Sequence, residues 1–259
     1  MNRINELFSE KSGNILSIYF TAGYPTLDST ADIISALTEN NVDMIEIGIP
    51  FSDPVADGPV IQDSNDKALQ NGMTLSLLFQ QLAGIRAITS VPLILMGYLN
   101  PIIQFGMTPF LEKASQCGID GVIIPDLPLT EVTDEYKALF KRHEIKMIFL
   151  ITPQTSRDRV KQIDNNLADG FIYMVTSTAI TGSDKGFGHT HTNYFELIRQ
   201  MQLSNPVLAG FGIYDKAGFE TVCRYVNGAI IGSGFIKALT NASGQLALDI
   251  KNFIQTIRP

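Results

Sequence analysis

Three carboxylates lie close together between residues 44 and 62, where the chain reads M-I-E-I-G-I-P-F-S-D-P-V-A-D-G-P-V-I-Q and carries Glu46, Asp53 and Asp57. In a β-strand from residue 44, alternation puts Glu46 and Gly48 on one face and isoleucines on the other. Loss of hydration penalises the charged form of a buried carboxyl and raises its pKa. Glu46 is therefore a candidate general acid or base.

Each carboxylate also has a structural explanation. Glu46 could pair with a buried Arg or Lys, because structural ion pairs also perturb titration. Asp53 precedes Pro and Asp57 precedes Gly, and in such dipeptides Asp commonly bonds its own backbone in a turn. On spacing alone, a catalytic and a structural role are about equally supported for Glu46. For a lone Asp before Pro or Gly, spacing favours a structural role in a turn.

Two glycine-rich segments near the C-terminus are candidates for phosphate binding. Residues 209–213 read A-G-F-G-I and residues 231–236 read I-G-S-G-F-I. The backbone N–H groups of Gly212, Gly232 and Ser233 could hold a phosphate at the start of a short helix. Each segment alone could equally serve a tight turn, but their coincidence after two successive strands favours a site.

Eight short apolar runs alternate with segments of helical period, and this alternation predicts one (β/α)8 barrel (TIM barrel) over residues 1–259. The predicted strands start at Ile15, Met44, Pro92, Gly121, Lys146, Phe171, Pro206 and Gly228. We also expect an extra N-terminal helix and short helices in the loops after strands two and eight. Thr74 and Thr130 are the expected N-caps of the helical segments whose apolar stripes begin at Leu75 and Val132. The alternative fold is a doubly wound open sheet, which would need a glycine-rich nucleotide-binding loop after its first strand. Residues 20–25, which follow the first predicted strand, contain only one glycine.

Composition and charge argue against several classes of function. A formal charge of −7 without a basic run argues against nucleic-acid binding. Cys117 and Cys223 stand far apart with no paired ligand, which favours a reducing compartment and disfavours a metal site. Residues 1–11 lack the apolar core of a secretory signal, and no stretch is apolar enough to span a bilayer. We therefore expect a cytoplasmic protein.

The string from Glu46 to Gln62 resembles the signature of the tryptophan synthase alpha chain family. T-A-G-Y-P at residues 21–25, M-G-Y-L-N-P at 96–101 and P-D-L-P at 125–128 extend the resemblance to nearly the whole chain. It implies a lyase that splits indole-3-glycerol phosphate into indole and glyceraldehyde 3-phosphate without a cofactor of its own. In that reaction Glu46 would be the catalytic acid/base, and Asp57 would engage the indole nitrogen.

The resemblance also implies the rest of the site. It places Phe20, Tyr98 and Leu99 around the indole ring, Tyr173 beside Glu46, Thr181 and Gly182 on a closing sixth loop, and Phe211, Gly212, Gly232 and Ser233 at the phosphate. Ser177 and Ala179 depart from the residues common in the family, so closure of this loop could differ. The implied partner is a pyridoxal-phosphate-dependent beta subunit in an αββα tetramer, contacted through Pro50, Asp53 and residues 125–128.

The same fold also carries other functions. A Schiff-base aldolase needs a desolvated lysine at the C-terminal end of a strand, whereas Lys146 begins its strand and Lys185 lies in the sixth loop. A phosphosugar isomerase or epimerase would share the phosphate site and one acid/base. A non-catalytic regulatory barrel is the third alternative, and the intact set of Glu46, Asp57 and Ser233 disfavours it.

Overall fold

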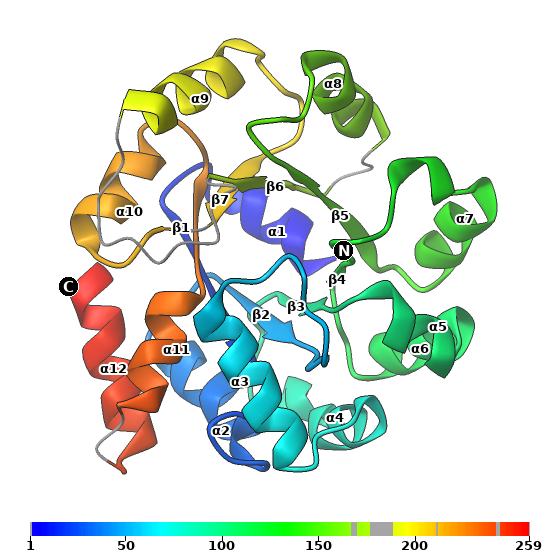
Figure 1. Cartoon of the computed structure of the whole chain (residues 1–259), viewed down its shortest axis with the longest axis vertical. Coiled ribbons are helices and arrows are strands. Elements are labelled where there is room, and N and C mark those ends of the chain that lie inside the picture. The colour runs from blue at the N-terminus through cyan, green and yellow to red at the C-terminus, as the bar shows by residue number, and fades with distance from the viewer. Residues whose placement is uncertain (1, 167–169, 177–188, 211, 242–243, 259) are drawn as a thin grey trace.

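The computed structural model describes residues 2–166, 170–176, 189–210, 212–241 and 244–258. The described residues form eight parallel strands that close into a barrel in the order β1 to β8, with helices around the outside (Figure 1). The predicted (β/α)8 barrel is therefore confirmed.

The strands start within one residue of their predicted positions. They are β1 (Ile15–Thr21), β2 (Met44–Gly48), β3 (Leu93–Met96), β4 (Gly121–Ile123), β5 (Lys146–Ile151), β6 (Ile172–Val175), β7 (Val207–Gly210) and β8 (Gly228–Ile231). Seven of the eight strands are almost wholly buried along their length, and β5 is half-buried at several positions. Burial on both faces explains the continuous apolar runs in the sequence.

The helices include the three additions that the sequence predicted: α1 at the N-terminus, α3 after β2 and α11 after β8. The α-helices are α1 (Arg3–Glu10), α2 (Ser29–Glu39), α3 (Pro59–Gln70), α4 (Leu75–Leu82), α5 (Leu99–Phe105), α6 (Met107–Gln116), α7 (Asp134–Arg142), α8 (Arg157–Asn166), α9 (His189–Gln200), α10 (Lys216–Cys223), α11 (Ser233–Thr240) and α12 (Leu246–Ile257). Short 3-10 turns lie at Ile85–Ala87 (η1) and Leu129–Glu131 (η2). The pair α5 and α6 after β3 was not anticipated.

One predicted helix cap is confirmed and the other is wrong. Thr74 caps α4, where its hydroxyl accepts a hydrogen bond from the N–H of Leu77. Thr130 instead lies inside η2, and Thr133 caps α7 by accepting from the N–H of Tyr136. The correction has a local cause: residues 129–131 form a separate 3-10 turn that delays the start of the helix by one turn.

Alternation along the strands separates two hydrophobic layers. Leu16, Ile18, Ile45 and Ile47 belong to the large outer layer between strands and helices. Ile15, Tyr19, Met44, Ile94, Met96, Ile123, Tyr173, Leu208 and Ile230 belong to a second cluster, which fills the barrel. Glu46 follows Met44 by two positions, so its side chain belongs to the interior, as the sequence predicted.

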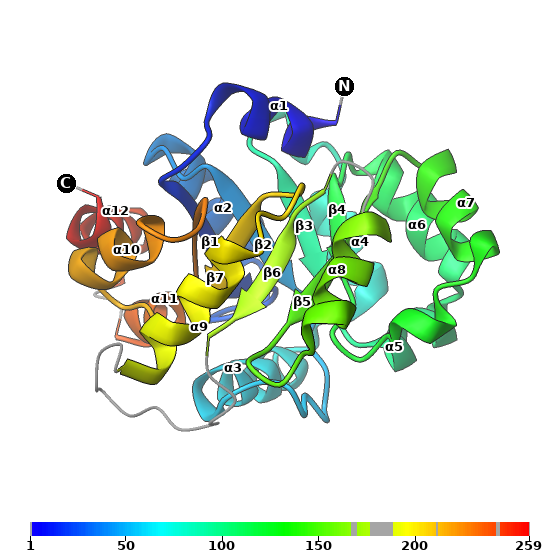
Figure 2. The ribbon, with the colours of Figure 1, turned by 90° about the horizontal axis from the view of Figure 1, so that it is seen from above.

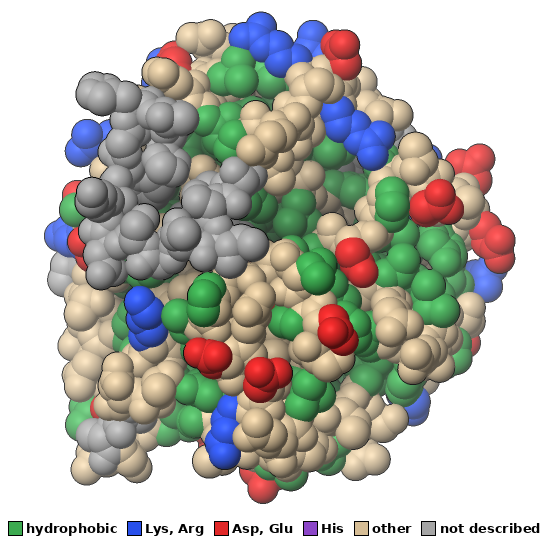
Figure 3. Space-filling view, viewed as in Figure 1, with side chains coloured by type: hydrophobic (Ala, Val, Ile, Leu, Met, Phe, Trp, Pro, Cys, Tyr) green, Lys and Arg blue, Asp and Glu red, His purple; other side chains and the backbone are tan. Residues whose placement is uncertain are grey.

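Helix α1 closes the N-terminal end of the barrel, and α3 lies at the opposite end (Figure 2). Ile4 of α1 is fully buried in the interior cluster, and the ring of Phe8 lies 6.1 Å from that of Phe171. Arg3 holds this helix to the strands through Asp120, at 3.1 Å. With that end plugged, the opening that remains is at the C-terminal ends of the strands. Figure 3 shows this face, where hydrophobic side chains surround a hollow near its middle.

Candidate active site

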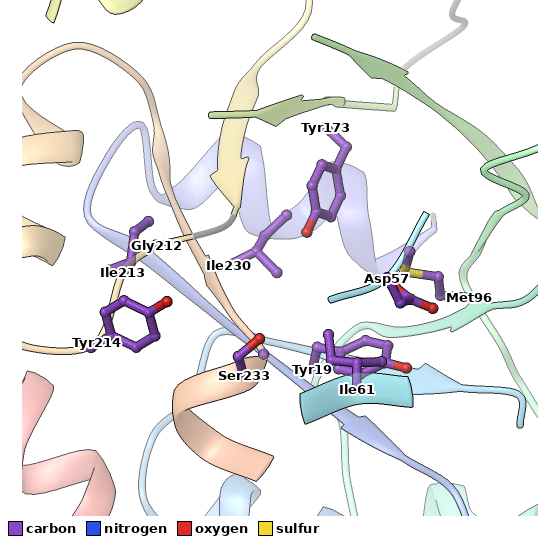
Figure 4. A pocket seen from close by; sticks show the side chains of 11 residues that line it. Tyr19, Asp57, Ile61, Met96, Tyr173, Gly212, Ile213, Tyr214, Ile230 and Ser233 are labelled. Carbon is purple, nitrogen blue, oxygen red and sulfur yellow. The ribbon is translucent and has the colours of Figure 1, made fainter. Parts of the chain in front are cut away.

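A pocket opens at the C-terminal ends of the strands and contains one acidic and several aromatic side chains. Its lining residues are Tyr19, Asp57, Ile61, Met96, Tyr173, Gly212, Ile213, Tyr214, Ile230, Gly232 and Ser233. In Figure 4, Asp57 and Met96 lie on one side, while Gly212, Tyr214 and Ser233 lie on the other. The pocket therefore has an acidic, apolar end and a glycine-rich end.

Glu46 lies inside the barrel with no exposed surface. The hydroxyl of Ser17 donates a hydrogen bond to its Oε1 at 2.9 Å. Its Oε2 is buried and has no hydrogen-bond partner within the described part of the chain. Burial raises the pKa of Glu46 to about 8, against a smaller lowering by the Ser17 hydrogen bond. The side chain is thus protonated at neutral pH and suited to donate a proton.

Two tyrosines connect Glu46 with the pocket. Tyr19 pairs with Glu46 across β1 and β2, and both Tyr19 and Tyr173 line the pocket. Burial raises the pKa of each phenol, and the charges of Glu46 and Asp57 raise both further. Glu46 itself does not line the pocket, but it pairs with Tyr19 across the strands and interacts electrostatically with both Tyr19 and Tyr173.

Glycines on the neighbouring strands make room for the tyrosine rings. A Cβ at Gly48 would overlap the hydroxyl of Tyr19, and a Cβ at Gly210 would overlap the hydroxyl of Tyr173. The two arrangements match, since each tyrosine leans over a glycine of the next strand. Any side chain at either glycine would push a phenol ring out of its place.

Asp57 stands on the loop between β2 and α3 and is 4% exposed. The hydroxyl of Tyr98 donates to its Oδ2 at 3.0 Å and accepts from the N–H of Ala56 at 3.0 Å. The ring of Tyr98 packs at 5.3 Å from that of Phe51, so Tyr98 fixes the loop as well as the carboxylate. Burial raises the pKa of Asp57 to about 6, while the Tyr98 hydrogen bond lowers it. At neutral pH Asp57 is mostly ionised.

The opposite end of the pocket suits an anion. Gly212 has a φ of +74°, which glycine adopts without strain. Gly232 and Ser233 stand at the start of α11, where the N–H groups of the first turn are free of helical partners and the helix dipole is positive. These three residues line the pocket from the ends of β7 and β8.

None of the three predicted indole-contacting residues is among those that line the pocket. Tyr98 contacts the lining residue Asp57. Phe20 is fully buried in the outer layer, because its neighbour Tyr19 takes the inward position on β1. Leu99 begins α5, donates its N–H to Asp126 at 2.8 Å and packs against the outer layer. Met96, the last residue of β3, lines the pocket instead. Strand alternation accounts for the position of Phe20, and the start of a helix accounts for that of Leu99; the contact of either residue with an indole ring stays a prediction.

Several pocket residues were missed from the sequence: Tyr19, Ile61, Met96, Ile213, Tyr214 and Ile230. For Tyr19 a signal existed, since Ser17, Tyr19 and Thr21 alternate with apolar residues along β1. Tyr214 lies beneath Lys237, whose Nζ is 5.7 Å from the ring centroid. Nothing in the local sequence connects that pair with a pocket.

Three predicted substrate contacts, Thr181, Gly182 and Phe211, lie outside the described residues. Ser177, Ala179 and Lys185 do so as well. Asp53 is exposed, and its carboxylate accepts a hydrogen bond from the neighbouring Ser52 hydroxyl. Over the ranges that the structure describes, no three His, Cys, Asp or Glu side chains gather as metal ligands, and no helix has the length and hydrophobicity to cross a bilayer.

Known proteins of similar sequence and structure identify the family of this chain. The sequence model of the family described as "Tryptophan synthase alpha chain" matches residues 6–258. The tryptophan synthase alpha chain of Flavobacterium psychrophilum is 54% identical, with 93% of this chain and 94% of that protein covered. That of Flavobacterium johnsoniae is 51% identical over 100% of both chains. The crystal structure of the alpha chain from Legionella pneumophila is similar with a TM-score of 0.87 at 30% identity, covering 100% of this chain and 96% of that one. The chain therefore belongs to the tryptophan synthase alpha chain family.

Proposed function

We propose that this chain cleaves indole-3-glycerol phosphate to indole and glyceraldehyde 3-phosphate, with Glu46 as the proton donor and Asp57 as the stabilising carboxylate. The reaction is the alpha reaction of tryptophan biosynthesis, a carbon–carbon lyase step. One observation carries the assignment of roles: Asp57 lines the pocket, where burial raises its pKa to about 6, and the fully buried Glu46, whose pKa burial raises to about 8, adjoins the pocket residue Tyr19.

The chemistry needs one neutral and one charged carboxyl at the same pH. Glu46 gives its proton to the indole carbon that bears the side chain, and the ring nitrogen becomes positively charged. Ionised Asp57 accepts a hydrogen bond from that N–H and stabilises the charge where it develops. The carbon–carbon bond then breaks, and its electron pair returns to the ring and neutralises the nitrogen.

The second product requires the loss of another proton. As the bond breaks, the side-chain hydroxyl on the adjacent carbon becomes the aldehyde of glyceraldehyde 3-phosphate, and its proton passes to a base. Glu46 is a carboxylate after the first step and can accept it, which restores the starting state. Tyr173, beside Glu46 and at the pocket surface, stands along this route.

The two ends of the pocket set the orientation of the substrate. We assign the phosphate to Gly212, Gly232 and Ser233, where backbone N–H groups and the α11 dipole favour an anion. The planar ring then reaches toward Asp57 between Tyr19 and Met96, which provide aromatic and aliphatic contacts. Thr181, Gly182 and Phe211 remain proposed contacts from the resemblance alone.

Family membership implies a beta subunit as partner, and we propose the αββα assembly for this chain. Pro50, Asp53 and residues 125–128 are the proposed contact regions. The exposure of Asp53 and of Val55, which is 75% exposed, supports a surface available to a partner here. A biosynthetic enzyme with two free thiols also fits the cytoplasm.

The test is an assay for indole released from indole-3-glycerol phosphate. Glu46→Gln keeps the size of the side chain and removes the acid, so we expect turnover to fall by at least about a hundredfold, the scale of general acid catalysis. Asp53→Asn is the matched control on the exposed part of the adjacent loop and should leave the turnover of the isolated chain unchanged. Near-native turnover by Glu46→Gln would refute the assignment.

A further inference from the structure

We propose that Ser17 is a positioning residue that determines which oxygen of Glu46 carries the proton to be donated. The inference rests on the proposed function, because it concerns the acid of that reaction. Ser17 was not among the residues that the sequence singled out, and it does not line the pocket. Its effect would pass entirely through Glu46.

Ser17 and Glu46 lie together in a hydrophobic interior. Both have no exposed surface, and the register of β1 and β2 places Ser17 opposite Met44, two residues before Glu46. The interior neighbours of the pair along and across the strands are the apolar residues Ile15, Met44, Ile94 and Ile230 and, opposite Glu46, Tyr19. Tyr173 is the other titratable side chain that interacts with Glu46. A hydroxyl buried in such surroundings is costly unless it is hydrogen-bonded, and the carboxyl of Glu46 meets that need.

The direction of this hydrogen bond distinguishes the two carboxyl oxygens. Ser17 Oγ and Glu46 Oε1 are 2.9 Å apart, and in the proposed arrangement the hydroxyl donates, so that Oε1 is the carbonyl oxygen of the neutral acid. The proton then resides on Oε2, which has no partner among the described residues. In the proposed mechanism an O–H group that has no partner among the described residues is donated to the substrate without breaking a bond to any of them.

The same bond also restricts the carboxyl to one orientation. Without it, the carboxyl group could turn about its terminal bond, since such torsions have broad, roughly two-fold preferences. The proton would then be presented on either oxygen. Loss of the hydroxyl should therefore lower the chemical rate while substrate binding stays the same, because Ser17 does not touch the pocket.

Threonine and valine at position 17 provide a matched pair. They have the same shape and β-branched form, which suits a strand, and they differ in the hydroxyl alone. We expect Ser17→Thr to keep most of the native kcat and Ser17→Val to lose about five- to tenfold relative to it, the scale of one hydrogen bond. KM should agree within about twofold between the two variants. Ser17→Ala repeats the test without added volume if the methyl groups disturb folding.

The pH profile provides a readout that simple structural damage would not move. The Ser17 hydroxyl stabilises the ionised form of Glu46 and so lowers its pKa. Its removal should shift the alkaline limb of kcat/KM to higher pH by about half a unit or more in Ser17→Val and Ser17→Ala, and leave it in place in Ser17→Thr.

The outcomes separate this inference from the proposed function. If Glu46→Gln is inactive while the valine and threonine variants agree in kcat and in pH profile, the role of Ser17 is refuted and the function stands. Faster turnover by Ser17→Val than by Ser17→Thr would also refute it. If Glu46→Gln retains native turnover, the function itself fails, whatever the Ser17 variants do.

Discussion

The buried, neutral state of Glu46 should make the stability of this protein depend on pH in a way that Glu46→Gln abolishes. The pKa of Glu46 rises from 4.5 to about 8 on folding because burial disfavours its charge. Below pH 4.5 both the folded and the unfolded chains are protonated at this residue. Between these values the unfolded chain ionises while the folded one stays neutral, so stability falls as pH rises.

The size of the effect follows from the shift. Each pH unit between the two pKa values costs about 1.4 kcal/mol, and the full loss above pH 8 approaches about 5 kcal/mol. That is a large part of the roughly 5–15 kcal/mol by which most domains are stable. Asp57 contributes in the same direction, since burial raises its pKa from 3.8 to about 6, but it is present in both proteins.

The assay is urea unfolding of the native chain and of Glu46→Gln at pH 6, 7, 8 and 9. Glutamine is neutral throughout and can still accept the Ser17 hydrogen bond, so its curve lacks the contribution of this residue. We expect the stability of the variant relative to the native chain to increase by about 2 kcal/mol between pH 6 and pH 8 and then to level off. A constant difference across this range would mean that Glu46 is ionised in the folded protein, and the acid role would be untenable.

Three further predictions follow from contacts around the site and the helices. Tyr98→Phe removes the donor to Asp57, so kcat/KM at pH 7 should fall by roughly tenfold and its acidic limb should move to higher pH, because the pKa of the carboxylate rises; unchanged kinetics would contradict this. Gly210→Ala places a methyl group where the Tyr173 hydroxyl lies. It should lower the free energy of unfolding by about 1–3 kcal/mol and also reduce the rate of indole release. A variant with a native melting curve and a native rate would contradict this prediction. Thr133→Ala removes the cap of α7 and should lower the free energy of urea unfolding by about 1 kcal/mol. Thr130→Ala, the matched control inside η2, should lower it much less, and equal losses in the two variants would contradict the assignment of the cap.

The sequence was sufficient where local rules dominate. Strand positions follow from apolar runs, and the inward direction of Glu46 follows from alternation, because side chains of a strand point to opposite faces whatever surrounds them. The glycine-rich end of the pocket could also be located, since glycines after successive strands and a helix start converge at one edge of a parallel barrel. Residues 44–62, through their resemblance to the family signature, identified Glu46 and Asp57 as the pair of candidate catalytic carboxylates.

The tertiary structure alone decided which neighbours complete the site. Alternation along β1 separates Phe20 from Tyr19, but only the closed barrel shows which of the two faces is the interior that opens into the pocket. The pairing of Tyr98 with Asp57 joins residues 41 positions apart, and Ser17 meets Glu46 across 29 positions. Such contacts, and the burial that separates the two carboxyl pKa values, arise from the closed barrel as a whole. No local pattern encodes them, because the loss of water at a side chain depends on every strand that surrounds it.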